Sequence, residues 1–237
     1  MEQKNQVEKE HKFLIERVKN LGFDPRHYFV ASDAAAQLHG VQQKKVPDMI
    51  HLIASPDLFK QLVEKHGLAP ARYNVPPKVV VEPGVEVSTR FWKSYRGAVQ
   101  QIDSVPVLRL GKLYNYMSTN EGSVNVTDSE AVKAKVASVL KDCKDKGKSN
   151  RQIGDHLGLS EQSVPVVASR LLKLKRSDWH DIGRPEPKAI VARLEETRYN
   201  WTVVEKEFFP EKSKAKAALM KILNGTPEWE AAKRKGQ

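Results

Sequence analysis

Hydrophobic positions follow two different periods along the first 141 residues, and this pattern predicts helices alternating with short strands. Apolar side chains three and four residues apart predict helices at 6–21, 33–39, 55–65, 110–117 and 128–141. Short runs rich in β-branched and aromatic residues predict strands at 28–31, 49–54, 78–81, 85–91 and 105–108. This order predicts an α+β N-terminal domain over 1–141, in which a mixed sheet is layered with helices.

The stretch 148–171 has the spacing of two short helices joined by a tight turn. Ile153 and Leu157 lie one helical turn apart and therefore share a face. Gly158 can take the left-handed conformation that ends the first helix, and the Ser160 side chain can cap the second. The inner stripe of the second helix consists of Val164, Val167 and Leu171. We therefore expect a helix-turn-helix within 142–176.

The outward face of the second helix mixes short polar, apolar and basic side chains, which suit base edges in a DNA major groove. Cations without an intervening acid follow the helix, and such cations suit phosphates. The candidate DNA-binding residues of this unit are Ser160, Gln162, Ser163, Val166, Ser169, Arg170, Lys173, Lys175 and Arg176. A module of this kind can instead serve packing or dimerisation, so this alternative stays open.

Pro165 does not suit the interior of the second helix. A proline there lacks a backbone donor, and its ring pushes against the carbonyl of the residue four positions earlier, Glu161. The helix is therefore expected to have an irregular first turn or to begin later than Ser160 indicates.

A second helical unit is predicted at 189–225, after a Pro-rich linker at 177–188 and before a charged tail, 226–237, that we expect to fray. Its helices are expected at 189–196, 202–208 and 213–223, with inner faces that include Val203 and Ala217 and with Ser213 as a cap. The segment 194–204 resembles the entry to helix-turn-helix units of the Fis type. Three lysines would then contact DNA: Lys212, Lys214 and Lys216. The alternative is a helical bundle with a solvated lysine face.

The formal net charge of +11 favours nucleic acid as the binding partner, because an excess of positive charge attracts a polyanion. Residues 1–143 have a net charge of +4 and residues 144–237 a net charge of +7, so the helical part is the more basic one. The single Cys143 excludes an internal disulfide. An apolar run of about 18 residues is absent and the start lacks the pattern of a secretory signal, so we expect a cytoplasmic protein, nucleoid-associated if bacterial or phage.

The segments 28–40, 46–53 and 105–113 resemble the minimal nucleotidyltransferase fold related to DNA polymerase beta. In that family a glycine pair opens a helix and holds the nucleotide, and two aspartates on the next strand bind magnesium. Here Ala31-Ser32-Asp33 replaces the glycine pair. Depending on the register of the strand, Asp48 or Met49 occupies the position of the first aspartate, and Ile50 or His51 that of the second. Neither register supplies both carboxylates. The resemblance therefore implies a catalytically silent domain, without a catalytic residue, metal or cofactor.

Other candidate sites give weaker signals. The seven histidines show none of the close pairings of a zinc site, and we expect them to be surface or capping residues. Cys143 lacks a neighbouring base and is expected to be an inert thiol. Gly183-Arg184-Pro185 resembles the centre of an AT-hook, but without flanking cations we assign it to the linker.

These patterns support the hypothesis of a DNA-binding protein, a transcriptional regulator, whose first domain provides contacts or a homodimer interface and whose partner is double-stranded DNA. Two alternatives stay open. One is an active nucleotidyltransferase with a nucleic-acid-binding tail, and the other is an assembly or adaptor protein of a phage or mobile element.

Overall fold

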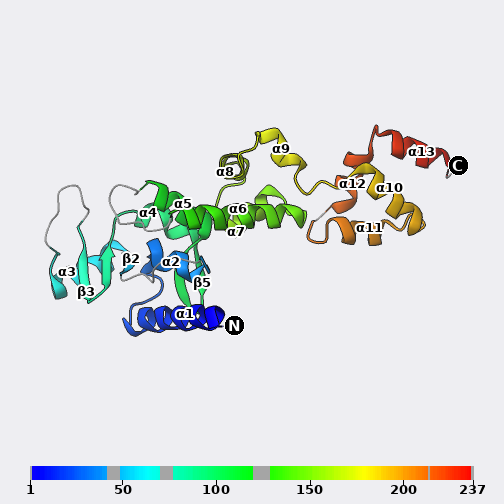
Figure 1. The fold of residues 1–237 in the computed structure, drawn as a ribbon. Coiled ribbons are helices and arrows are strands. Elements are labelled where there is room, and N and C mark those ends of the chain that lie inside the picture. The colour runs from blue at the N-terminus through cyan, green and yellow to red at the C-terminus, as the bar shows by residue number, and fades with distance from the viewer. Residues whose placement is uncertain (1, 42–48, 70–76, 120–128, 213, 236–237) are drawn as a thin grey trace. The chain divides into compact units, whose positions relative to one another are not determined.

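The structure, a computed structural model, describes residues 2–41, 49–69, 77–119, 129–212 and 214–235 (Figure 1). The chain divides into two compact units. The first comprises Met1–Val136 with Leu157–Leu159, and the second comprises Ala137–His156 with Ser160–Gln237. Helix α6 (Ser129–Asp145) continues without interruption through residue 141, where the sequence pattern had placed the end of the first domain.

A six-stranded mixed sheet runs through the described part of the first unit. Its spatial order is β3 (Val79–Glu82), β4 (Val85–Ser88), β2 (Ile50–Ala54), β1 (Tyr28–Ala31), β6 (Val105–Leu108) and β5 (Val99–Ile102). The pairs β1–β6 and β2–β4 are parallel, and the other three pairs are antiparallel. All residues of β1, β2 and β6 are buried, because these strands are mostly apolar on both faces.

The helices of the first unit are α1 (Glu2–Asn20), α2 (Ser32–Leu38), α3 (Pro56–His66), α4 (Trp92–Tyr95) with the 3₁₀ turn η1 (Arg96–Ala98), and α5 (Leu110–Thr119). Helix α2 contacts β1, β2 and α5, and α1 contacts α2. The start of α3 is set by Ser55, whose Oγ accepts a hydrogen bond from the Leu58 amide at 3.3 Å, and by Pro56 in the first helical position. The expected mixed α+β architecture is thus confirmed.

The hydrophobic pattern missed strand β5 and helix α4. Strand β5 includes Gln100 and Gln101 and lies at the edge of the sheet, so it lacks the apolar run of a central strand. It pairs with β6 through the turn at Asp103 and Ser104, which both have a positive φ, as in a two-residue hairpin. Strand β4 ends at Ser88 rather than at Phe91, and Phe91, with a left-handed φ of 73°, directly precedes α4.

The second unit is helical in its described residues. Besides the C-terminal part of α6 it contains α7 (Asn150–Leu157), α8 (Ser163–Leu171), α9 (Arg176–Asp181), α10 (Pro187–Glu196), α11 (Trp201–Phe208), α12 (Ala215–Leu223) and α13 (Pro227–Lys235). Helices α10 to α13 share one apolar core. None of the helices in the described ranges is long and apolar enough to cross a membrane.

Three expectations for this unit are wrong. The predicted linker 177–188 contains most of α9, and the tail that we expected to fray forms α13, because Trp229 and Ala232 are buried in the core of this unit and α13 contacts α10. Val203 is 40% exposed and Ala217 is also exposed, although both were assigned to inner faces. The buried face of α12 runs through Ala215, Leu219, Ile222 and Leu223. Ser213, the expected cap, lies outside the described residues.

Candidate nucleic-acid interface

Helix α7 begins with a reciprocal cap. The Gln152 amide donates to Ser149 Oγ at 3.2 Å, and the Ser149 amide donates to Gln152 Oε1 at 2.8 Å. Ile153 is fully buried, as its spacing predicted. The helix ends before Gly158, whose φ of 72° is the left-handed conformation expected there. The beginning and end of α7 are thus both fixed by the local sequence.

The second helix of the pair begins later than Ser160. The Ser160 carbonyl accepts hydrogen bonds from the amides of Ser163 and Val164, and Ser160 Oγ lies 2.6 Å from Ser163 Oγ. Helix α8 starts at Ser163, which makes Pro165 its third residue. In the first turn of a helix the backbone donors have no intrahelical acceptor, so proline costs little there. The late start resolves the conflict that Pro165 posed in the sequence.

The exposure of α8 follows the expected division between an inner and an outer face. Its buried residues are Val164, Val167 and Ala168, whereas Leu171 is half-buried. Gln162, which precedes the helix, and Arg170 are exposed. The remaining candidates on the outer face, Ser163, Val166 and Ser169, are half-buried, and Ser160 is exposed. Side chains of mixed polarity are therefore accessible along one side of α8.

Four cations lie at the end of α8 and the start of α9, and we call Arg170, Lys173, Lys175 and Arg176 the α8–α9 basic segment. All four are exposed. The nearest acid in sequence, Asp178, accepts a hydrogen bond from the Lys175 backbone amide at 3.2 Å and so caps α9. Four cations against one carboxylate leave this stretch with a net positive charge.

Trp179 fixes α9 in the second unit. Its side chain is fully buried, its indole Nε1 donates to Asn150 Oδ1 at 3.0 Å, and the Lys144 ammonium lies 5.1 Å from its ring centroid. Helix α9 also packs against α8. The sequence interpretation missed this anchor, although a tryptophan within a presumed linker was a signal for a packed element.

The three lysines proposed from the last helical unit have different surroundings. Lys214 and Lys216 are exposed, and the Lys216 ammonium lies 5.2 Å from the Trp201 ring centroid. Lys212 is half-buried, with its ammonium 4.7 Å from the centroid of Phe209. Burial lowers the pKa of Lys212, and the nearby positive charge of Lys221 lowers it further. Lys212 therefore belongs to a more enclosed environment than a DNA-facing lysine on an open helix.

The strand position that the nucleotidyltransferase resemblance assigns to magnesium holds a buried histidine. Its ring Nε2 lies 3.1 Å from Ser88 Oγ, and its Nδ1 lies 3.2 Å from the Tyr116 hydroxyl. Burial lowers the pKa of His51 to about 4, so the ring is neutral near neutral pH. We call His51, Ser88 and Tyr116, with Lys78 and Glu86, the His51 cluster. The expectation of a surface or capping role is wrong for His51.

These residues do not fit a magnesium ion. Magnesium requires several oxygen ligands, whereas His51 offers nitrogen and the Glu86 carboxylate is paired with the Lys78 ammonium at 2.5 Å. Asp48, the remaining candidate, lies outside the described residues. In the parts of the chain that the structure describes, no three His, Cys, Asp or Glu side chains gather as around a metal ion. Cys143 is buried, and burial raises the pKa of its thiol, as expected for an unreactive cysteine.

Comparison of the chain with protein-family models, with curated proteins and with solved structures found no match. The helix-turn-helix and nucleotidyltransferase-like assignments therefore stay predictions. Function has to be inferred from the chain's own side chains, and the accessible face of α8 with the α8–α9 basic segment offers the strongest recognition chemistry among the residues predicted to bind DNA.

Proposed function

We propose that this protein binds double-stranded DNA as a transcriptional regulator, with the α7–α8 pair as its recognition element. One observation carries the proposal: an accessible face of mixed polarity on α8 leads directly into four exposed cations. Base edges are read by side chains of the first kind and phosphates are bound by the second. The net charge of +11 favours the same polyanionic partner.

The roles divide along the chain. Gln162, just before α8, and Ser169 and Arg170, toward its end, are the proposed readers of base edges. Lys173, Lys175 and Arg176 are the proposed phosphate contacts, which set affinity without reading sequence. The Ser163 hydroxyl is engaged with Ser160 at the start of the helix, so its proposed role is to hold the turn as well as to contact DNA.

For the first unit we propose a contact or dimerisation role without catalysis. What supports this is the composition of the His51 cluster, in which the ring nitrogens and the Glu86 carboxylate already have partners within the fold. A nucleotidyltransferase would need free carboxylates at these positions.

The proposal is tested by measuring duplex DNA affinity at several salt concentrations. The logarithm of the association constant should fall with the logarithm of salt, with a slope of about 0.9 for each phosphate contact. Lys173→Ala with Lys175→Ala should make that slope shallower by about 2 and weaken binding to all sequences alike. The matched control is Lys188→Ala with Lys206→Ala, two exposed lysines of the same unit outside the basic segment.

If both double variants lost DNA affinity to the same extent, the α8–α9 basic segment would not be part of the DNA interface. Absence of DNA affinity even at low salt would overturn the proposal and favour an adaptor that binds protein. Sequence reading is tested separately, by selecting bound fragments from a random DNA pool. Gln162→Ala and Arg170→Ala should each relax the selected sequence, at a cost of about 1 to 3 kcal/mol per good base contact.

A further inference from the structure

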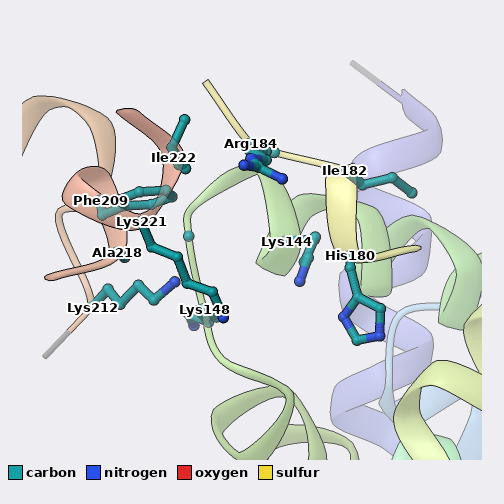
Figure 2. Close-up of a pocket in the computed structure, with 12 residues that line it drawn as sticks. Lys144, Lys148, His180, Ile182, Arg184, Phe209, Lys212, Ala218, Lys221 and Ile222 are labelled. Atoms are coloured by element: carbon teal, nitrogen blue, oxygen red, sulfur yellow. The ribbon is translucent and has the colours of Figure 1, made fainter. Parts of the chain in front are cut away.

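The second unit contains a cavity of about 390 Å³ that the proposed DNA contacts do not explain (Figure 2). Three segments line it: the end of α6 with the following loop, the end of α9 with the connector to α10, and the loop after α11 with helix α12. Its basic lining residues are Lys144, Lys148, Arg184, Lys212 and Lys221, with His180 beside them. We call it the lysine cavity. Its size is in the range of pockets that hold small molecules.

Positive charge accumulates in this cavity. None of the lining residues that the structure describes is an aspartate or glutamate. The side chains of Lys212 and Lys221 extend from different positions toward Lys148 (Figure 2). Among these cations, Lys148 is paired with Glu211, whose carboxylate lies 3.0 Å from its ammonium. The ammonium groups of Lys148, Lys212 and Lys221 repel one another, and a bound anion would relieve that repulsion.

The cavity also has an apolar wall and a fixed shape. Phe209 and Ile222 are both buried and line it. Gly147 and Gly183 allow the surrounding segments to approach closely, since a Cβ at Gly147 would collide with the Phe209 ring and one at Gly183 with the Lys144 carbonyl. The backbone segments around the cavity are thus closely packed, and Lys148 and Lys212 are half-buried at its edge.

We propose that the lysine cavity binds a phosphorylated small molecule of nucleotide size. Its phosphates would lie among the ammonium groups of Lys148, Lys212 and Lys221, and its less polar part would lie against Phe209 and Ile222. Lysine is a point charge that suits phosphate oxygens, and the apolar wall suits a flat ring. The site is separate from the residues of α8, so it does not depend on DNA binding. It also gives Lys212 a role other than the DNA contact inferred from sequence.

The test uses the full chain and four probes at constant ionic strength: inorganic tripolyphosphate, ATP, adenosine and sulfate. Titration calorimetry and the Tm of thermal unfolding report binding. Tripolyphosphate and ATP should bind and raise the Tm, and adenosine should bind far more weakly. Lys212→Gln with Lys221→Gln should weaken both phosphate probes by about tenfold or more, because two charge-assisted contacts are lost.

The matched control is Lys214→Gln with Lys216→Gln, which removes the same charge at the beginning of α12, outside the cavity. Lys148→Gln is a second cavity variant, and far-UV circular dichroism checks that each variant is folded. Two results would show that the effect is a general response to anions and would overturn the proposal. One is an equal loss of tripolyphosphate and ATP affinity in the control pair, and the other is a Tm increase of the same size with sulfate. Binding of duplex DNA but not of ATP or tripolyphosphate through Lys212 and Lys221 would also overturn it, in favour of a nucleic-acid backbone contact.

Discussion

Two polar clusters of the described residues, the His51 cluster of the first unit and the lysine cavity of the second, differ in how their charges are compensated. In the His51 cluster both ring nitrogens lie within hydrogen-bond distance of hydroxyls, and Lys78 neutralises Glu86 at 2.5 Å. In the lysine cavity, Lys148, Lys212 and Lys221 converge while Glu211 is the carboxylate paired with Lys148. One cluster satisfies its polar groups internally, and the other leaves a surplus of positive charge.

This difference indicates which cluster offers a ligand the more favourable binding free energy. A ligand at His51 would have to break existing hydrogen bonds and replace the Lys78–Glu86 ion pair, which costs energy before any is recovered. An anion in the lysine cavity would instead reduce repulsion that is already present. The nucleotidyltransferase resemblance would place a ligand site in the first unit, whereas the surplus of positive charge lies in the second.

The largest expected effect comes from Trp179, which lies beside the lysine cavity. Trp179→Ala should lower the free energy of unfolding by about 3 to 5 kcal/mol, because it removes a fully buried indole. It should also abolish tripolyphosphate binding, since α9 leads into the connector that lines the cavity. Chemical denaturation followed by circular dichroism measures the first effect and calorimetry the second.

Trp179→Phe is the matched variant. It keeps an aromatic ring in the same place but loses the hydrogen bond to Asn150, so it should cost less than Trp179→Ala and retain tripolyphosphate binding. If Trp179→Ala leaves stability and binding unchanged, α9 is a linker after all and the cavity does not depend on it.

The elements of the first unit were predictable where hydrophobic periodicity is strong. Strands β1 and β6 have the bounds that the sequence indicates, because a short apolar run flanked by turn residues leaves few alternatives. Strand β5 was missed because its two glutamines belong to a sheet edge, and α9 because a single Trp179 gives no periodicity. Both elements are set by tertiary contacts that local pattern does not encode.

The candidate sites also differ in whether local sequence or tertiary contacts form them. The accessible face of α8 followed from a short helix with one apolar stripe, so local sequence was sufficient. The lysine cavity joins Lys148 to Lys212 and Lys221, which lie more than 60 positions further along the chain. Tertiary contacts bring these distant cations together: the Lys148–Glu211 ion pair, the Gln152 hydrogen bond to the Glu211 carbonyl, and the close approach of Gly147 to Phe209.

The second prediction concerns pH and His51. The pKa of His51 falls from 6.5 to about 4 on folding because the ring is buried, so the unfolded chain binds the proton more tightly. Stability is therefore unaffected by this group above pH 6.5 and is lost as pH falls from 6.5 toward 4. The loss should reach about 3 kcal/mol at most, at about 1.4 kcal/mol per pKa unit. His51→Gln should flatten this part of the stability curve, measured by urea unfolding.

His66→Gln is the control, because His66 is an exposed histidine in the last turn of α3. It should leave the pH dependence as it is in the unmodified chain. Tripolyphosphate affinity should be the same in both variants, since neither histidine lines the lysine cavity. A loss of tripolyphosphate binding in His51→Gln alone would mean that the two clusters are linked, against the contrast drawn between them.

The smallest expected effect is on tripolyphosphate affinity in Glu211→Gln. This variant tests directly whether surplus positive charge in the lysine cavity drives anion binding. Glu211→Gln removes the carboxylate paired with Lys148 while the backbone carbonyl of residue 211 can still accept the Gln152 side-chain hydrogen bond. A half-exposed ion pair is worth about 0.2 to 1 kcal/mol, so tripolyphosphate affinity should increase up to about fivefold. Glu207→Gln is the control, because Glu207 pairs with Arg193 at 2.6 Å and does not line the cavity. Weaker tripolyphosphate binding in Glu211→Gln, measured by calorimetry against this control, would mean that the carboxylate positions Lys148 for the ligand rather than competing with it.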